Sequence, residues 1–294
     1  DDWTDPEVLK KANPGWDLIF RGSDLVEDMR RANTPRKQAA FLRYTVNRWV
    51  KSSVRWVDSR AWSACATSDP AKYVRELEGK QCYGGLDLSM TRDIAAFVLY
   101  FPPQEGINEF RVLPTFFLPH DNIDELGADS RAPYREWAEA GMLTLTPGDW
   151  IDYTYIKEVI LELAQRYSIL RIGYDPYRAA ELIQSLQDAD LEVLTVPQTM
   201  RHLTDPTETL EGRIRRRELV HPNSPVLNWQ VSNCQLIYDT KGNFMLAKAD
   251  RATNNRYKMD GVAALVDAVA AHTHDIQNAP DEPVYAKRPW FLQL

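Results

Sequence analysis

"YGGLDLSMTRDIAAFVLYFPP", residues 83–103, contains the end of one apolar run and the whole of a second, with a short polar turn between them. Apolar runs at 82–87 and 94–101, separated by turn residues, predict two strands that pair as an antiparallel hairpin. Asp87 ends the first strand. A single acidic residue in that place is normally a turn former, because it bonds its own backbone. Its significance therefore depends on whether other carboxylates reach the same place.

Beyond this hairpin the chain alternates between strand and helix patterns. A further strand is predicted at 109–118, and a second hairpin at 235–248 turns at Lys-Gly-Asn. The remaining strands are expected at 142–146, 169–175 and 191–196, and the helices at 134–140, 153–167, 178–188, 204–218 and 256–272. Hairpin strands followed by strand–helix alternation indicate an α/β domain with a mixed sheet.

Three parts of the chain differ in pattern. Residues 1–65 show helical spacing with proline- and asparagine-rich turns and no evident core of their own. Strand patterns start near residue 80, and we expect the α/β domain to occupy residues 66–278. Residues 279–294 are rich in proline and charge, which predicts a flexible tail.

Composition is ordinary for a soluble globular protein. Of the 294 residues, 44% are hydrophobic and 26% charged, and no apolar run reaches the about 18 residues of a membrane-spanning helix. The three cysteines lack a CxxC spacing and the polar N-terminus has no signal-peptide core, so we expect a cytosolic protein without a zinc cluster. The net charge of −7 is concentrated in residues 67–200, whereas 1–66 and 201–260 have an excess of lysine and arginine. A local basic surface for phosphate is therefore available.

Three aspartates occupy comparable positions. Asp87 and Asp175 end predicted strands, and Asp260 lies near the start of a predicted helix. Functional residues of open α/β sheets gather at strand ends, and carboxylates are ligands that Mg²⁺ prefers. Three carboxylates can hold two metal ions about 3.5–4 Å apart, the arrangement that cleaves phosphodiesters. Each aspartate taken alone is more often a turn former, a cap or a solvated charge.

The placement of Asp260 depends on which side of its helix is buried. The helical projection gives an aliphatic stripe within residues 262–269, with Asp260, small alanines and Asp267 opposite. If only the aliphatic stripe is buried, Asp260 faces water. If the small side approaches the sheet closely, Asp260 lies beside the strand ends. Asp93 or Asp267 is then a candidate fourth carboxylate.

Several segments resemble the nuclease region of the large terminase subunit of tailed bacteriophages. In chain order they are YGGLDLSMTRDIAAFVLYFP, GYDPYRAAELIQSL, ELVHPNSPVLNWQVSN and KGNFMLAKADRATNNRYKMDGVAALVDAV. Two N-terminal stretches, DPEVLKKANPGW and AAFLRYTVNRWV, resemble the part that joins the ATPase motor to the nuclease. The resemblance implies an RNase H-like mixed sheet flanked by helices, with a β-hairpin insertion and an N-terminal helical segment.

The resemblance also implies a function. It is that of an endonuclease that cuts concatemeric viral double-stranded DNA with two Mg²⁺ or Mn²⁺ ions. This takes place in the cytoplasm of the infected host, with the terminase small subunit and the portal protein as partners. The acidic triad would be Asp87, Asp175 and Asp260, with Asp87 as the bridging ligand. Asp175 stands where many relatives have glutamate, and KMDG where many have KIDG, so both keep a carboxylate. No G-x-x-x-x-G-K-[ST] phosphate loop is present, and residues 1–65 are expected to be the remnant of the ATPase domain and its linker.

Basic residues are candidate DNA contacts. EGRIRRREL, residues 211–219, contributes Arg215 and Arg216, while Lys248 and Lys258 flank the approach to Asp260. Such contacts to phosphate position DNA without reading its sequence. Solvated surface charge is the alternative for all four. The HTH stretch at 272–274 is expected to be an exposed helix end.

Two rival functions fit the same sequence. Another RNase H-like nuclease, of resolvase or transposase type, would use the same acids, and a preference for branched over linear duplex would separate it. A docking module for DNA or the portal would bind without cutting. In such a module, substitution of the aspartates by alanine would not change the affinity for cations.

Overall fold

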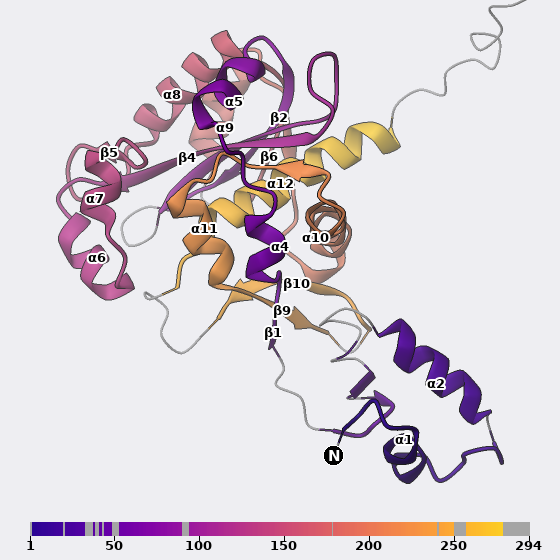
Figure 1. The fold of residues 1–294 in the computed structure, drawn as a ribbon. Helices are drawn as coiled ribbons and strands as arrows, with labels where there is room; N and C mark the ends of the chain where they lie inside the picture. The colour runs from indigo at the N-terminus through magenta and orange to yellow at the C-terminus, as the bar shows by residue number, and fades with distance from the viewer. Residues whose placement is uncertain are drawn as a thin grey trace, which may run out of the picture.

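A mixed sheet forms the centre of the computed structural model (Figure 1). The structure describes residues 2–278, apart from 20, 33–37, 39–40, 43, 49–52, 90–93, 178, 240 and 250–256. In this part of the chain the sheet has seven strands in the order β5-β4-β3-β2-β6-β7, with β8 beside β4. The strands are β2 (Gln81–Asp87), β3 (Ala95–Phe101), β4 (Phe110–Pro119), β5 (Thr144–Thr146), β6 (Ser168–Tyr174), β7 (Val193–Thr195) and β8 (Leu219–Val220).

Strand directions bring distant segments to one edge of this sheet. β3 is antiparallel to both β2 and β4, whereas β6 is parallel to β2 and β7 is parallel to β6. The carboxyl ends of β2, β4, β6 and β7 therefore share an edge. The predicted hairpin of β2 with β3, and the predicted mixed α/β sheet, are confirmed.

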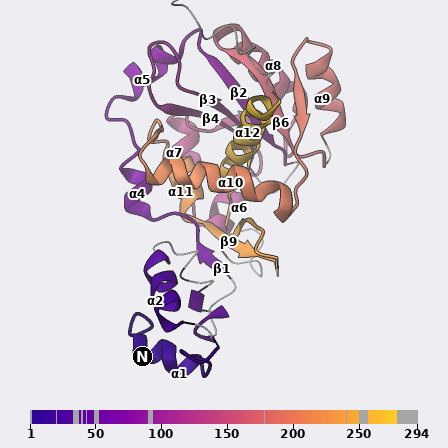
Figure 2. The same ribbon diagram turned by 90° about the vertical axis from the view of Figure 1, so that its right-hand side faces the viewer.

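Helices cover both faces of the sheet, as the alternation within β3 shows. Ala96, Val98 and Tyr100 belong to one buried cluster and the intervening residues to another. The first cluster includes α4 (Ser59–Ser63), α10 (Met200–Arg215), α11 (Pro225–Ser232) and α12 (Asp260–Gln277), and the second includes α5 (Pro70–Leu77), α8 (Tyr153–Arg166) and α9 (Ala180–Gln187). Figure 2 shows α12 against the strands, with α10 and α11 beside it.

A second, smaller sheet lies outside the central one. The predicted hairpin at 235–248 is confirmed as β9 (Cys234–Tyr238) and β10 (Phe244–Lys248), and β1 (Ser53–Arg55) pairs with β9. β1 is a strand inside the segment expected to be mostly helical. It forms because β9 offers a free edge for backbone pairing.

The N-terminal helices α1 (Pro6–Ala12) and α2 (Gly22–Arg31) pack in a small cluster of their own around Leu9 and Ala32. They project from the body that holds the central sheet (Figure 1). β1 and α4 instead join that body. The domain boundary at residue 65 and the flexible tail stay predictions, and residues 279–294 lie outside the described residues.

Several helix boundaries differ from those expected. α10 begins at Met200 and contains Pro206, and α12 begins at Asp260 and ends at Gln277. Three helices arise where none was expected, α5, α6 (Ile123–Ser130) and α11. α11 begins with the favoured combination of proline in the first turn and a serine cap, whose hydroxyl accepts from the Leu227 amide. The helix predicted at 134–140 is confirmed as α7 (Tyr134–Glu139).

None of the helices in the described residues is both long and apolar enough to span a bilayer.

Candidate functional site

Asp87 ends β2 on the face of the sheet that α12 covers. Alternate residues of a strand point to the same face, so Tyr83, Gly85 and Asp87 point the same way. The Tyr83 ring contacts the ring of His272 in α12, with 5.1 Å between centroids. The Asp87 carboxylate therefore lies at the end of the sheet-to-helix interface.

Asp175 directly follows β6 and faces the same way. Leu86 pairs with Tyr174 in parallel register, so Asp87 and Asp175 occupy the next positions on neighbouring strands, which lie about 4.8 Å apart. Arg171, four residues earlier, forms an ion pair of 2.9 Å with Asp275 of α12. Pro176 then prevents continuation of the ladder, because it has no amide hydrogen. These two residues are thus neighbours at one edge.

Two glycines bring α12 unusually close to this pair of strands. A Cβ at Gly85 would lie 1.8 Å from the backbone oxygen of Ala264, and one at Gly173 would lie 2.2 Å from that of Asp267. Gly85 and Gly173 are themselves paired across β2 and β6. The glycine pair therefore permits helix backbone to rest on strand backbone, as glycine often does inside strands.

Asp260 is the first residue of α12 and is only 6% exposed. The next residue, Gly261, packs against Phe116, which lies level with Asp87 two strands away in the sheet. The Gly261 amide donates to the Gln230 side-chain oxygen at 2.7 Å. Of the two placements considered for Asp260, the structure shows the buried one, because α12 is covered on its small side as well as on its aliphatic stripe.

Asp267 lies two turns further along α12 and is 2% exposed. Burial raises the pKa of its carboxyl well above the ordinary value, while the Gln198 amide, which donates at 3.2 Å, lowers it and the charge of Asp175 raises it further. Asp267 also lines a cavity of about 60 Å³ between α10, β10 and α12. It is therefore a buried acid near Asp175. The other candidate, Asp93, lies outside the described residues.

The raised pKa of Asp267 gives a pH prediction. The folded protein holds this proton at pH values where the unfolded chain, with a pKa near 3.8, has released it, so stability falls as pH rises above that value. Asp267→Asn should retain the oxygen that accepts from Gln198 and remove this loss. We expect the variant to gain stability over the native chain as pH rises from 4, by at most about 1.4 kcal/mol per pH unit. Urea unfolding between pH 4 and pH 8 measures the difference, and a constant difference would contradict the prediction.

The carboxylates at this edge do not form a closed metal-binding cluster. Over the described residues, no three histidine, cysteine, aspartate or glutamate side chains are grouped so that they could hold a metal ion. The donors themselves are of the right kind, since Asp87, Asp175 and Asp260 offer hard oxygen ligands of the type that Mg²⁺ takes. The structure thus places two acids side by side and directs the helix of the third to the same edge.

The basic residues expected to contact DNA are in varied surroundings. Arg215 pairs with Glu211 at 3.1 Å, and Arg216 makes two bonds of 2.7 and 2.8 Å to Glu218, at the C-terminal end of α10. Lys258 is 1% exposed, and Lys248 is half-buried at the end of β10. DNA contacts by these four residues stay predictions.

The expectation of an exposed helix end at 272–274 is wrong for His272, which is buried. Its ring packs edge-on against Tyr83, Tyr100 and Phe110. Burial, with the charge of nearby Arg213, lowers the pKa of His272 to about 4. Arg213 itself lies 3.7 Å above the Phe110 ring. One arginine of the basic run is therefore part of the core.

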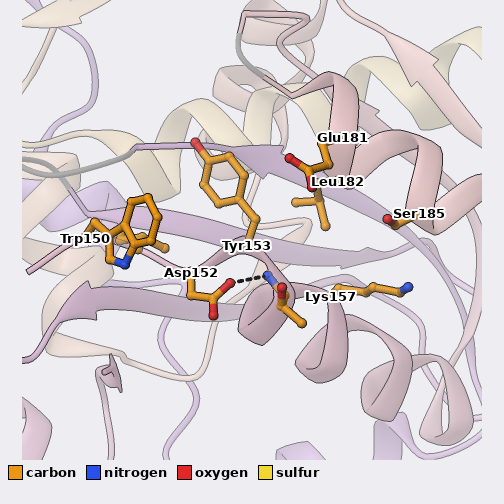
Figure 3. Close-up of a pocket in the computed structure, with 9 residues that line it drawn as sticks. Trp150, Asp152, Tyr153, Lys157, Glu181, Leu182 and Ser185 are labelled. Atoms are coloured by element: carbon orange, nitrogen blue, oxygen red, sulfur yellow. Dashed lines mark hydrogen bonds between the residues drawn. The ribbon is translucent and has the colours of Figure 1, made fainter. Parts of the chain in front are cut away.

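A hollow of about 500 Å³ lies between the starts of α8 and α9 (Figure 3). Trp150, Asp152, Lys157 and Glu181 are among its lining residues, and Asp152 accepts from the Thr154 amide at 2.8 Å. The Asp152 carboxylate thus caps α8. Local sequence patterns did not predict this hollow, at which Trp150 is exposed.

The central strands define the class of this protein. A sheet whose first hairpin is antiparallel, extended by parallel strands and ending in paired aspartates, is an RNase H-like fold. The family model "Terminase large subunit, endonuclease domain" matches residues 1–275, and the chain belongs to this family.

Individual relatives agree with this family. The chain is 30% identical over 279 residues to "Protein YmfN" of Escherichia coli (strain K12), covering 92% of this chain and 60% of that protein. It is 26% identical to "Terminase, large subunit" of Enterobacteria phage HK97, covering 90% and 51%. The crystal structure of the HK97 large terminase matches with a TM-score of 0.63 at 23% identity, covering 92% of this chain and 55% of that one. The chain thus spans about half to three fifths of the length of these relatives.

Proposed function

We propose that this chain is a metal-dependent endonuclease that cuts double-stranded DNA. The observation that supports this most directly is that Asp87 and Asp175 occupy neighbouring positions at the ends of adjacent parallel strands, on the face covered by the helix of Asp260. Membership of a terminase endonuclease family makes phosphodiester hydrolysis the chemistry to expect of such acids.

Asp87, Asp175 and Asp260 would hold two Mg²⁺ or Mn²⁺ ions, with Asp87 bridging them. Bound metal lowers the pKa of its water and offsets the charge that develops on the phosphate. The residues of this chain supply position: Asp87 and Asp175 are fixed by the sheet register, and Asp260 by α12 and the Gly261–Gln230 bond. Neighbouring carboxylates also repel one another, which favours cation binding between them.

The biological substrate proposed is concatemeric viral DNA, cut during genome packaging in the cytoplasm of the infected bacterium. The terminase small subunit and the portal protein are the proposed partners. The part of the relatives that this chain does not cover is proposed to contain the ATPase motor. Among the predicted DNA contacts, Lys248 is at the end of β10 that pairs with Cys234, near α12. Arg215, Arg216 and Lys258 are the other proposed phosphate contacts.

Incubation of supercoiled plasmid with the native chain in Mn²⁺, Mg²⁺ or EDTA tests this function. We expect nicked and linear products with either metal, none in EDTA, and none from Asp175→Asn, which retains the shape of the side chain and removes its charge. Cutting in EDTA would contradict the metal mechanism. A folded native chain that binds DNA without cutting would favour the docking module, and a preference for branched DNA over linear duplex would favour a resolvase.

A further inference from the structure

Two basic side chains lie together at the start of α10. Arg201 is in the first turn of α10, and Lys241 is in the turn that joins β9 to β10. Together with Asp239 and Asn243 they line a hollow of about 460 Å³. The Thr204 hydroxyl accepts from the Phe244 amide at 2.9 Å, which ties the beginning of α10 to the beginning of β10. The positions of Arg201 and Lys241 relative to each other are thus set by the contact between α10 and the β9–β10 hairpin.

Asp239, the acidic residue of the hollow, accepts hydrogen bonds from its own turn. Asp239 accepts from the backbone amides of Lys241 and Asn243 at 2.8 and 2.9 Å and from the Asn243 side chain at 2.7 Å. These bonds, that of the Asn243 side chain first, lower the pKa of Asp239. Arg201 and Lys241 are both exposed, and neither forms an ion pair within the described residues. They differ in this from Arg216 at the other end of the helix, which is held by Glu218.

This hollow lies near the edge that holds the aspartates. The Val196 amide, just after β7, donates to the Tyr174 oxygen next to Asp175 at 2.9 Å. Arg201 follows Val196 by five residues, a span of at most about 18 Å. With one phosphate per strand every 3.4 Å of duplex axis, that is about five base pairs. A duplex at the aspartates can therefore reach Arg201.

The opposite side of the same edge is acidic. β4 ends there and is followed by Asp121 and by α6, whose Asp124, Glu125 and Asp129 are exposed, as is Asp121. Only the two basic residues Arg131 and Arg135 accompany them before α7 ends. This side repels phosphate, whereas the N-terminal end of the α10 dipole adds to the charge of Arg201 and Lys241.

We propose that Arg201 and Lys241 bind the phosphodiester backbone of duplex DNA beside the aspartates, so that the duplex leaves this edge over α10 and the β9–β10 turn. This rests on the proposed function for its choice of ligand. The contact is to phosphate and is independent of base sequence. It adds a DNA contact at the N-terminal end of α10, whereas Arg215 and Arg216 lie at the C-terminal end.

The test is equilibrium binding of a labelled 30-base-pair duplex in EDTA, by fluorescence anisotropy between 50 and 200 mM salt. Arg201→Gln with Lys241→Gln should weaken binding about tenfold at low salt and reduce the slope of log K against log salt by about 2. The control is Lys72→Gln with Arg75→Gln, two exposed residues of α5 on the opposite face of the sheet, which should leave the slope unchanged. All four side chains are outside the core, and circular dichroism verifies the fold of each variant.

An unchanged slope in the Arg201/Lys241 variant, or an equal reduction in the Lys72/Arg75 variant, would overturn the proposal. Absence of duplex binding by the native chain would also overturn it. Plasmid cutting is measured separately, so a failure to cut rejects the nuclease function alone. If the native chain cuts normally but the salt slopes contradict the expected values, only the proposed phosphate contact is rejected.

Discussion

Gly85→Ala is expected to destabilise the protein by about 3 kcal/mol or more, at the upper end of the usual range for overpacking a core. The new methyl group would lie 1.8 Å from the Ala264 oxygen and 2.6 Å from the Ala268 nitrogen. Both are backbone atoms of α12, so no side-chain rotation relieves the contact. The helix has to move away from β2, and its neighbours in the core move with it. Because α12 also carries Asp260, we expect metal-dependent cutting to be lost as well.

Urea unfolding at constant pH measures this effect through the midpoint and the slope. Gly212→Ala is the matched control, since the three atoms nearest to its new Cβ all belong to the flexible side chain of Arg216, the nearest at 3.0 Å. Alanine is the better helix former by about 1 kcal/mol, so the control should be stabilised. A Gly85→Ala midpoint equal to that of the native chain would mean that α12 does not rest on β2 as described.

The strands of the site and the β2–β3 hairpin were predictable from the sequence, whereas the pairing of β2 with β6 was not. Local apolar runs gave the β2–β3 hairpin, and Asp175 before a proline marked the end of another strand. The adjacency of β2 and β6 depends on contacts between segments more than 80 residues apart, which no local pattern contains. Gly85 and Gly173 were the available signal, because glycine inside a strand pattern often marks close backbone approach.

The sequence also left undecided which side of α12 is buried. Its sequence has one aliphatic stripe and one side of alanines, and periodicity alone favours burial of the first. Both sides are buried in the structure because the glycine pair admits the alanine side. The surroundings of charged residues were equally hidden from the sequence. Arg213 is held over the Phe110 ring, whereas Arg216, three residues later, is exposed and paired with Glu218. A run of arginines does not reveal which members have partners.

Asp87→Asn is expected to lower metal-dependent cutting by about a thousandfold, the upper end for loss of one group that stabilises charge in a transition state. The amide keeps the size of the carboxylate and removes the charge that draws cations to the edge. Asp260→Asn should have an effect of similar size. Single-turnover nicking over a range of Mn²⁺ concentrations, with Mn²⁺ binding by calorimetry, separates weaker binding of metal from slower chemistry.

Asp267→Asn is the matched control for Asp260→Asn, since both are buried aspartates on the same helix. Asp267 accepts from Gln198 and lies within the field of Asp175, and the proposed triad does not include it. Cutting by Asp267→Asn should therefore stay within a few-fold of the native rate. If it fell as far as in Asp260→Asn, with weaker Mn²⁺ binding, Asp267 would be a fourth ligand. If Asp260→Asn cut normally, the helix start would be structural, and Asp87 with Asp175 would need a different third acid.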